Sequence, residues 1–195
     1  MPKRRGNGTH IYGNVVFTVN SAKTIGGAIY GSNIWIGRQG TARVSITDNI
    51  AGTYGGGIAS VDKVYLGRVD VTNNTAGTPV STTSGGGIYS EGLFAVTSTT
   101  NISNNKSVGY GGGIYVTSTG TLQIEYLPYI DGNTNTNNEA SDIYLSHNSS
   151  IGASAKIKII NGLYKTADLG MMAVPIGLRV GLNGTAFTTG WANAN

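Results

Sequence analysis

The chain has 195 residues, a formal net charge of +4 and 11 % charged residues, well below the level of about a quarter that is usual in globular proteins. Low charge together with 39 % apolar residues argues against a disordered chain, and the absence of Cys excludes disulfides and thiolate metal sites. No apolar run reaches the length of about 18 residues that a transmembrane helix needs.

Residues 1–10 form a short basic N-terminal tail. Lys3, Arg4 and Arg5 supply three of the 13 basic residues in the chain. No apolar segment follows them, so the tail as written is not a secretory signal peptide. We expect either a solvated end or an electrostatic anchor for nucleic acid or for an acidic partner surface.

A glycine-rich phrase then recurs, as "IGGAIYG" (25–31), "YGGGIAS" (54–60), "SGGGIYS" (84–90) and "YGGGIYV" (110–116). The Ile after the glycines is Ile29, Ile58, Ile88 and Ile114, and "SDIYL" adds Ile143, at steps of 29, 30, 26 and 29 residues. This period is typical of a solenoid, in which units that cannot bury an apolar side alone are stacked on one another.

Each unit contains three short stretches in which apolar and polar residues alternate. The repeat Ile opens the first, the second resembles "NIWIG" (33–37), and the third ends on Asn, as in "VSITDN" (44–49). Alternation places Ile29, Ile34, Ile36 and Ile46 inside, and Tyr30, Trp35 and Thr47 outside. We therefore predict an all-β fold over residues 11–160, a right-handed, single-stranded parallel β-helix of about six coils of 26–30 residues.

Glycines and asparagines are predicted to form the corners of each coil. Glycine supplies positive φ and leaves room where backbones of consecutive coils approach at about 4.8 Å. Asparagine tolerates the left-handed region, and stacked Asn side chains can form hydrogen bonds from coil to coil. The predicted turn residues are Gly26, Gly27, Gly55, Gly56, Gly85, Gly86, Gly111, Gly112, Asn49, Asn74, Asn105 and Asn133. An insertion such as residues 75–84 is expected to bulge from one corner without disturbing the stack.

The phrases "GGGIY", "ITDNIA" and "ASDIYL" carry a resemblance to known proteins. Over about residues 8–160 the chain resembles the pectin-lyase-like β-helical surface proteins of bacteria. These include polymorphic outer-membrane-type adhesins and long repeat proteins of gut Firmicutes, in which the series often closes on "SDIYL", "KIKIINGL" and an "IGLRV"-like strand, as here. The resemblance implies the β-helix fold and a surface or adhesive role, and similar repeats also occur in bacteriophage spikes and fibres.

Residues 161–195 depart from the repeat and are predicted to form a terminal coil and an irregular cap. "AKIKII" (155–160) alternates, with Ile157 and Ile159 inward and Lys156 and Lys158 outward, and "PIGLRVG" (175–181) reads as a further strand. We expect residues 164–172 to be a helical or irregular segment, and Trp191 to cover the last coil.

Catalytic and metal-binding patterns are weak. A glycosidase needs two carboxylates about 5–10 Å apart, and the nine acids are dispersed. Asp62 and Glu91, which follow the repeat Ile of adjacent coils, come closest to such a pair, and we interpret them as solvated charges. His10 and His147 lie in turn-like contexts without partners at ligand spacing, so we expect surface histidines. The sequence thus predicts no enzyme, no metal and no cofactor.

Aromatic residues define the candidate binding surface. Tyr30, Tyr89, Tyr115 and Tyr144 each follow a repeat Ile and share the outer face, Ala59 interrupts this row, and Trp35 and Tyr65 are candidates for a second row. Such a row either stiffens the solenoid as a stacking ladder or provides a platform for sugar rings or a partner protein. Nucleic-acid binding is not expected, because few basic residues are interleaved with the rings.

Taken together, these patterns favour a non-enzymatic structural or adhesive solenoid of a bacterial cell surface or extracellular assembly. We expect a homo-oligomer or larger assembly, with cell-surface glycans or host proteins as possible ligands of the outer faces. Two alternatives stay open: a virion component such as a fibre, spike or capsid decoration, and a carbohydrate-binding or polysaccharide-cleaving β-helix.

Overall fold

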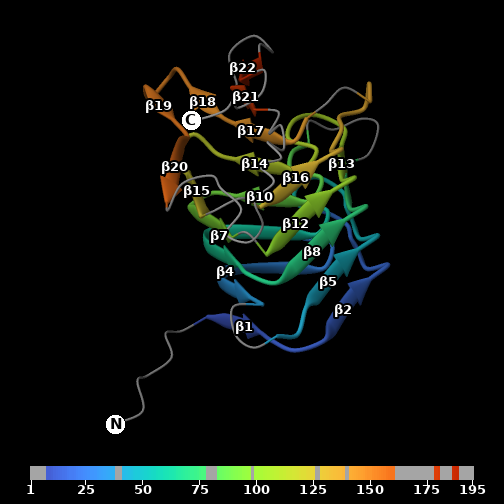
Figure 1. Ribbon diagram of the computed structural model, residues 1–195. Helices are drawn as coiled ribbons and strands as arrows, with labels where there is room; N and C mark the ends of the chain where they lie inside the picture. Colours follow the sequence, from blue (N-terminus) through green and yellow to red (C-terminus); the bar gives the residue numbers. More distant parts are fainter. Residues whose placement is uncertain are drawn as a thin grey trace.

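The computed structural model describes residues 8–37, 41–77, 83–97, 99–125, 128–138, 141–160, 178–180 and 186–188. In these residues the chain forms four β-sheets and no helix. Consecutive coils stack along one axis, from β1 at one end to β17 and β21 at the opposite end (Figure 1).

Sheet A is built from the glycine phrase and the stretch that follows it. Its eleven strands are β1 (Thr9–Ile11), β4 (Ile29–Ile36), β7 (Ile58–Leu66), β10 (Ile88–Ser90), β11 (Leu93–Thr97), β14 (Ile114–Val116), β15 (Thr121–Glu125), β17 (Ile143–Leu145), β20 (Lys156–Ile160), β21 (Leu178–Val180) and β22 (Ala186–Thr188). The sequence predicts two separate strands in each unit here. In β4 and β7 they are continuous, with a register shift between Gly31 and Asn33 in β4.

Two further parallel sheets complete each coil. Sheet B contains β2 (Val15–Thr18), β5 (Val44–Thr47), β8 (Val69–Thr72), β12 (Thr100–Ser103) and β16 (Tyr129–Asp131). Sheet C contains β3 (Ser21–Ala22), β6 (Ile50–Ala51), β9 (Thr75–Ala76) and β13 (Lys106–Ser107). The sequence reasoning missed sheet C, whose strands have two residues each and follow directly after the corner Asn.

The number of complete coils is smaller than the six predicted. Four coils carry strands in all three sheets, namely those that contain β2, β5, β8 and β12. The next coil has β14, β15 and β16, but at the position of sheet C the described residues form only an isolated bridge between Lys106 and Thr134. Beyond it, β17, β20 and β21 extend sheet A alone. The coils lose their third side here because the sequence departs from the repeat.

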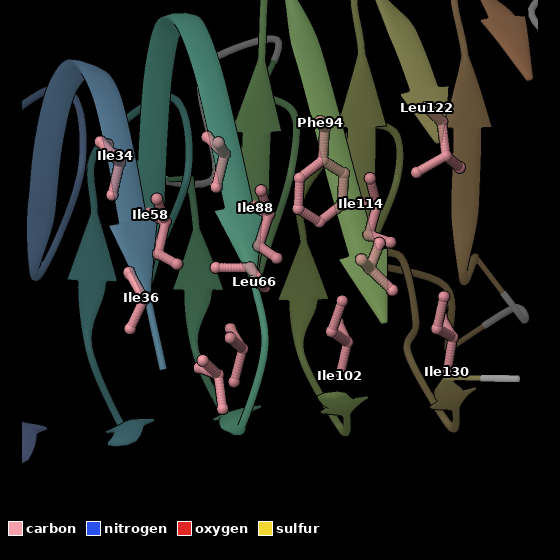
Figure 2. Packing of buried hydrophobic residues seen from close by; sticks show 14 of the residues in the cluster. Ile34, Ile36, Ile58, Leu66, Ile88, Phe94, Ile102, Ile114, Leu122 and Ile130 are labelled. Atoms are coloured by element: carbon pink, nitrogen blue, oxygen red, sulfur yellow. The ribbon is translucent and has the colours of Figure 1, made fainter. Parts of the chain in front are cut away.

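The core is a column of apolar side chains, nearly all aliphatic with Phe94 among them, enclosed by the three sheets (Figure 2). Parallel pairing keeps equivalent residues in register, so Ile29, Ile58, Ile88, Ile114 and Ile143 lie above one another. Most of these side chains are completely buried, as are Ile34, Ile36 and Ile46. Tyr30 is exposed and Trp35 and Thr47 are half-buried, which confirms the inside and outside assignment made from the alternation.

The glycine corner is where consecutive coils approach most closely. The first glycine of each phrase has positive φ, 65° at Gly26 and 72° at Gly85. The second glycine lies against the backbone of the next coil. A Cβ on Gly86 would be 2.3 Å from the carbonyl oxygen of Gly112 and 2.4 Å from that of Lys106. Since no side chain fits there, glycine is required for the coils to stack at this spacing.

The asparagine corner differs from the prediction in one respect. The left-handed residue is not the landmark Asn but the residue before it: Asp48, Asn73 and Asn104 have φ of 57°, 56° and 56°. That conformation turns the next side chain inward, and Asn49, Asn74, Asn105 and Asn133 are all buried.

At the ends, the structure refines the expected boundaries. β1 begins at Thr9, inside the segment expected as a tail, and pairs with β4. In β20, Lys156 and Lys158 are exposed, while Ile157 and Ile159 pack against the core, as predicted.

β21 pairs parallel with β17 and antiparallel with β22. Two further strands, β18 (His147–Asn148) and β19 (Ala153–Ser154), form a small antiparallel hairpin. The predicted segment 164–172 and Trp191 lie outside the described residues.

Candidate interaction surface

A continuous stack of tyrosine rings lies on the outer face of sheet A. Tyr89 and Tyr115 are 5.6 Å apart between ring centroids with an interplanar angle of 6°, and Tyr115 and Tyr144 are 5.2 Å apart at 9°. These three rings come from β10, β14 and β17, which are paired in register. The spacing between strands therefore brings the rings into face-to-face contact.

Two tyrosines that the sequence reasoning did not include extend this stack. Tyr54 lies 4.7 Å from Tyr89, and Tyr110 lies 4.5 Å from Tyr144, between ring centroids. Both precede a glycine triplet by one residue, in "YGGG". Tyr54 contacts Tyr89 although the register partner of Tyr89 is Ala59, which has no ring. The shared position before the glycines is the sequence signal that could have identified the two residues.

We use the name tyrosine stack for Tyr54, Tyr89, Tyr115, Tyr144 and Tyr110. Tyr30, the remaining member of the predicted row, is 59 % exposed and pairs in register with Ala59. No ring contact is recorded for it among the described residues, so the structure does not join it to the stack.

A second, shorter aromatic row lies on the same sheet. Trp35 and Tyr65 stack at 5.4 Å, as the sequence suggested, and His10 stacks on the other side of Trp35 at 4.8 Å with an interplanar angle of 6°. His10 lies on β1 in register with Trp35, which corrects its assignment to a turn. Its Nδ1 lies 2.8 Å from the hydroxyl of Tyr12. His147 lies on β18, and its Nδ1 is 2.7 Å from the Ser154 hydroxyl.

Stacking determines what the tyrosine stack offers to a partner. Each inner ring uses its faces for the rings above and below, so its edge and hydroxyl are what remain for other contacts. Tyr110 is 53 % exposed and is the most open member of the stack. The arrangement therefore provides a line of phenol edges rather than the open ring faces on which sugar rings stack.

Burial within the stack changes the acidity of two phenols. Desolvation, followed by the nearby tyrosines Tyr115 and Tyr110, raises the pKa of Tyr144 to about 12. The pKa of Tyr89 is raised too, by desolvation first and then by the charge of Glu91, whose Oε1 accepts a hydrogen bond from the Tyr89 hydroxyl at 3.3 Å. Both hydroxyls are thus neutral donors at physiological pH.

The polar core consists of an asparagine ladder, made by Asn20, Asn49, Asn74, Asn105 and Asn133. Each of the first four donates from its backbone N–H and its Nδ2 to the Oδ1 of the Asn in the next coil, at 2.8–3.0 Å. The last, Asn133, donates in the same way to Oδ1 of Asp142. Asn20 extends the ladder by one coil beyond the predicted set.

Asp142 is a buried acid whose role the sequence reasoning did not identify. It is 4 % exposed and ends the asparagine ladder as an acceptor. Asp70 also has a defined role, since its carboxylate pairs with Nε of Arg43 and accepts a bond from Nη2 at 2.6 Å. The hydrogen bond to Asp70 raises the pKa of Arg43.

The remaining candidates are placed as follows. Asp62 lies in β7 and Glu91 in the turn after β10, on adjacent coils, where the N–H of Glu91 donates to the carbonyl of Ser60. Lys3, Arg4 and Arg5 lie outside the described residues. In the described ranges, no group of three or more metal-ligating side chains is gathered, and no helix could cross a membrane.

The fold and this surface define a class of protein, a parallel β-solenoid built from a stacked repeat with a glycine corner and an asparagine ladder. Comparison with protein families finds a match to the Chlamydia polymorphic membrane protein repeat in three segments, residues 14–32, 68–91 and 99–117. Each matched segment contains one ladder residue, Asn20, Asn74 or Asn105, and one glycine phrase. No curated protein and no solved structure matches the chain significantly. In these three segments the chain is thus similar to the repeat of Chlamydia polymorphic membrane proteins.

Proposed function

We propose that this chain is a non-enzymatic, adhesin-type repeat segment displayed on a bacterial surface, and that it contacts partners through its outer faces. The observation that carries the proposal is the position of the three matched repeats. They coincide with the structural unit of the solenoid, from a strand of sheet B through the Asn corner to the glycine phrase.

The tyrosine stack is the proposed contact surface. It crosses the coils that contain β7, β10, β14 and β17, and its rings are preorganised because each is held by its neighbours. Preorganised aromatic side chains bind at low entropic cost, and tyrosine combines apolar area with a hydrogen-bonding hydroxyl. Since ring edges and hydroxyls are presented, the stack suits a protein or glycoprotein with hydrogen-bond acceptors better than it suits stacking of sugar rings.

The experiment is a bead-adhesion assay. The purified chain is coupled to fluorescent microspheres, which are applied to epithelial cell monolayers and to immobilised mucin. We expect binding above that of albumin-coated beads. The variant Tyr89→Phe/Tyr115→Phe/Tyr110→Phe keeps the stacked rings and removes three hydroxyls, and we expect it to fold normally and to bind less.

Tyr30→Phe is the matched control, because Tyr30 is exposed on the same sheet but lies outside the stack. Its beads should bind like those of the unmodified chain. If no bead binds either surface, the adhesive role is refuted. If all variants bind equally, the stack is not the contact surface.

We also expect no turnover of pectin, alginate or other polyuronides. Asp62 and Glu91 come closest to a catalytic pair among acids that are otherwise dispersed along the sequence. Release of unsaturated or reducing sugar ends is measured. A rate above background that Asp62→Asn or Glu91→Gln abolishes would establish an enzyme.

A further inference from the structure

Four copies of the motif Asn-x-Ser/Thr lie wholly within the described residues, and they begin at Asn73, Asn101, Asn105 and Asn148. This motif is the acceptor for N-linked sugars, which are attached to the side-chain amide of an accessible Asn. In a chain so rich in Asn, Ser and Thr the motif alone carries little weight. The fold therefore decides which copy a transferase can reach.

Two of the copies are fixed in sheet B and in the asparagine ladder. Asn105 is completely buried, and its Nδ2 donates to the Val71 carbonyl and to Oδ1 of Asn133. Asn101 lies in β12, which pairs with β8 on one side and with β16 on the other, and its Oδ1 is buried. A transferase could enclose either amide only after a strand had left the stack of coils, which costs a large part of the stability of the fold.

The copy at Asn73 is exposed but is also fixed in the coil. Its hydroxyl residue, Thr75, lies in β9, which pairs with β6 and with β13. The middle residue, Asn74, is buried and bonded to Asn49 and Asn105 in the ladder. Residues 73–75 therefore cannot leave the surface together unless the ladder breaks.

The copy at Asn148 lies in a hairpin at the edge of the coil stack (Figure 1). Its strands, β18 and β19, have two residues each and pair only with each other in the part of the chain that the structure describes. All residues from 148 to 152 are exposed. The hairpin is closed at its base, where the N–H of Ala155 donates to the Ser146 carbonyl at 2.9 Å. Because few bonds hold it, it can open without disturbing β17 or β20.

The side chain of Asn148 is also held in an arrangement that suits transfer. Its Oδ1 accepts a hydrogen bond from the Ser150 N–H at 3.0 Å, which forms an Asx turn. This bond keeps the Asn148 amide close to Ser150, the residue that carries the hydroxyl of the motif. No described residue accepts a hydrogen bond from Nδ2 of Asn148, so the nitrogen that would receive the sugar is available, in contrast to that of Asn105.

We propose that Asn148 is an N-glycosylation site of the folded chain, and that the donor is a hexose activated at its anomeric carbon by a diphosphate. In the transfer, Nδ2 of Asn148 forms a bond to the anomeric carbon, and the bond from that carbon to the diphosphate oxygen breaks. The diphosphate leaves with the bonding electrons, and one proton of Nδ2 passes to a base of the transferase, so nothing is oxidised or reduced. The proposal does not depend on the adhesive function.

The test is incubation of the purified, folded chain with UDP-glucose and a soluble N-glycosyltransferase that recognises Asn-x-Ser/Thr. Mass spectrometry of peptides assigns each added hexose to its Asn. We expect Asn148 to be modified about tenfold or more faster than Asn73, Asn101 or Asn105, because only its segment opens at low cost. A digest of the same chain with a Glu-specific protease, in which no fold protects the motifs, should accept hexose at all four positions.

Ser150→Ala keeps the backbone N–H that bonds to Asn148 and removes only the hydroxyl of the motif, so modification of Asn148 should be lost. Ser149→Ala is the matched control, since it changes the middle residue of the motif and should leave the rate unchanged. Three results would each overturn the proposal: a folded chain without hexose at Asn148, equal modification of the four positions in the folded chain, or modification of Asn148 that Ser150→Ala leaves unchanged. Hexose confined to Asn148 in the digest would contradict the selection by the fold.

Discussion

At the scale of single residues, two neighbouring asparagines at the same corner have opposite roles. Asn73 adopts the left-handed conformation and faces solvent, and Asn74 turns inward and is completely buried. Oδ1 of Asn74 accepts two hydrogen bonds from Asn49, and Nδ2 of Asn74 donates to the Ile46 carbonyl and to Oδ1 of Asn105. The ladder thereby satisfies buried polar groups that the corner of each coil would otherwise leave unpaired.

Asn74→Ala should therefore destabilise the chain strongly. The substitution leaves the buried N–H of Asn49 without its acceptor, and it also removes the bonds that Nδ2 of Asn74 donates to the Ile46 carbonyl and to Oδ1 of Asn105. An unsatisfied buried group costs about 1–3 kcal/mol and each lost bond about 1 kcal/mol, so a loss of about 3 kcal/mol or more is expected. Urea denaturation followed by circular dichroism measures the free energy of unfolding.

The control for that measurement is Asn73→Gly, which changes the adjacent residue without touching the ladder. Glycine suits φ of 56° and occupies the equivalent position at Gly132, so a change within about 1 kcal/mol is expected. If both variants lose similar stability, the ladder is not what holds this corner.

The sequence alone predicts the asparagine ladder, but not which residue at each corner adopts the left-handed conformation. The recurrence of Asn at a fixed place in each unit predicts a ladder, and coil-to-coil bonding between the side chains is observed. The predicted position of the left-handed residue was wrong by one, because the pairs "DN" and "NN" place two residues of similar turn propensity side by side. Asp142 was missed as the end of the ladder because it belongs to the glycine phrase of another unit, not to an Asn corner.

At the scale of elements, the glycine phrase and the tyrosine stack determine how coils meet on sheet A. The second glycine of each phrase allows close backbone approach, and the tyrosines on the outer face add stacking between coils. Both features repeat with the coil, which is why the sequence pointed to them. The contact between Tyr54 and Tyr89 joins residues from different positions of the repeat, so alignment of equivalent positions could not predict it.

Gly86→Ala should prevent normal stacking of the coils. The new Cβ would lie 2.3 Å from the Gly112 carbonyl oxygen, a backbone atom that cannot move without shifting the next coil. We expect a loss of about 3 kcal/mol or more, or no folded protein. Thermal unfolding by circular dichroism measures it.

Gly31→Ala provides the comparison. The Cβ at Gly31 would meet only the Ile34 side chain at 3.5 Å, an ordinary contact, and the next coil carries Ser60 in register. This substitution should leave stability unchanged or raise it by about 0.4–1 kcal/mol, because it restricts the unfolded chain. Equal damage from both substitutions would contradict the assignment of the close approach to the second glycine.

The tyrosine stack should make stability fall at alkaline pH. The pKa of Tyr144 is raised from 10.0 to about 12, so the folded chain holds this proton more tightly than the unfolded chain does. Its contribution is complete below pH 10 and is lost as the pH rises toward 12. We expect the melting temperature to decline over this window and the decline to be smaller in Tyr144→Phe. An identical decline in both proteins would show that Tyr144 is not responsible.

At the scale of the whole molecule, the regular part of the solenoid was predictable and its ends were not. The repeat period and the alternation of apolar residues determine the parallel coils and the core, since each unit must find the same environment as the last. Sheet C was not predicted, because strands such as Ser21–Ala22 and Thr75–Ala76 are too short to show an alternation of apolar and polar residues. The coil count was overestimated because the Ile143 phrase keeps the repeat in sheet A after sheet C has ended.

The two ends differ in chemistry as well as in sequence. Residues 11–22 of the first described coil carry no charge, whereas the last described coils carry the exposed Lys156 and Lys158 and the Asp142 carboxylate that accepts from Asn133.

The location of the chain in its native setting tests the account most directly. Antibodies raised against the purified chain are applied to intact and to permeabilised cells of the organism that encodes it, with a cytoplasmic protein as the control for leakage. A surface repeat protein predicts labelling of intact cells that protease shaving removes. Labelling that appears only after permeabilisation, or only in purified phage particles, would contradict the surface role.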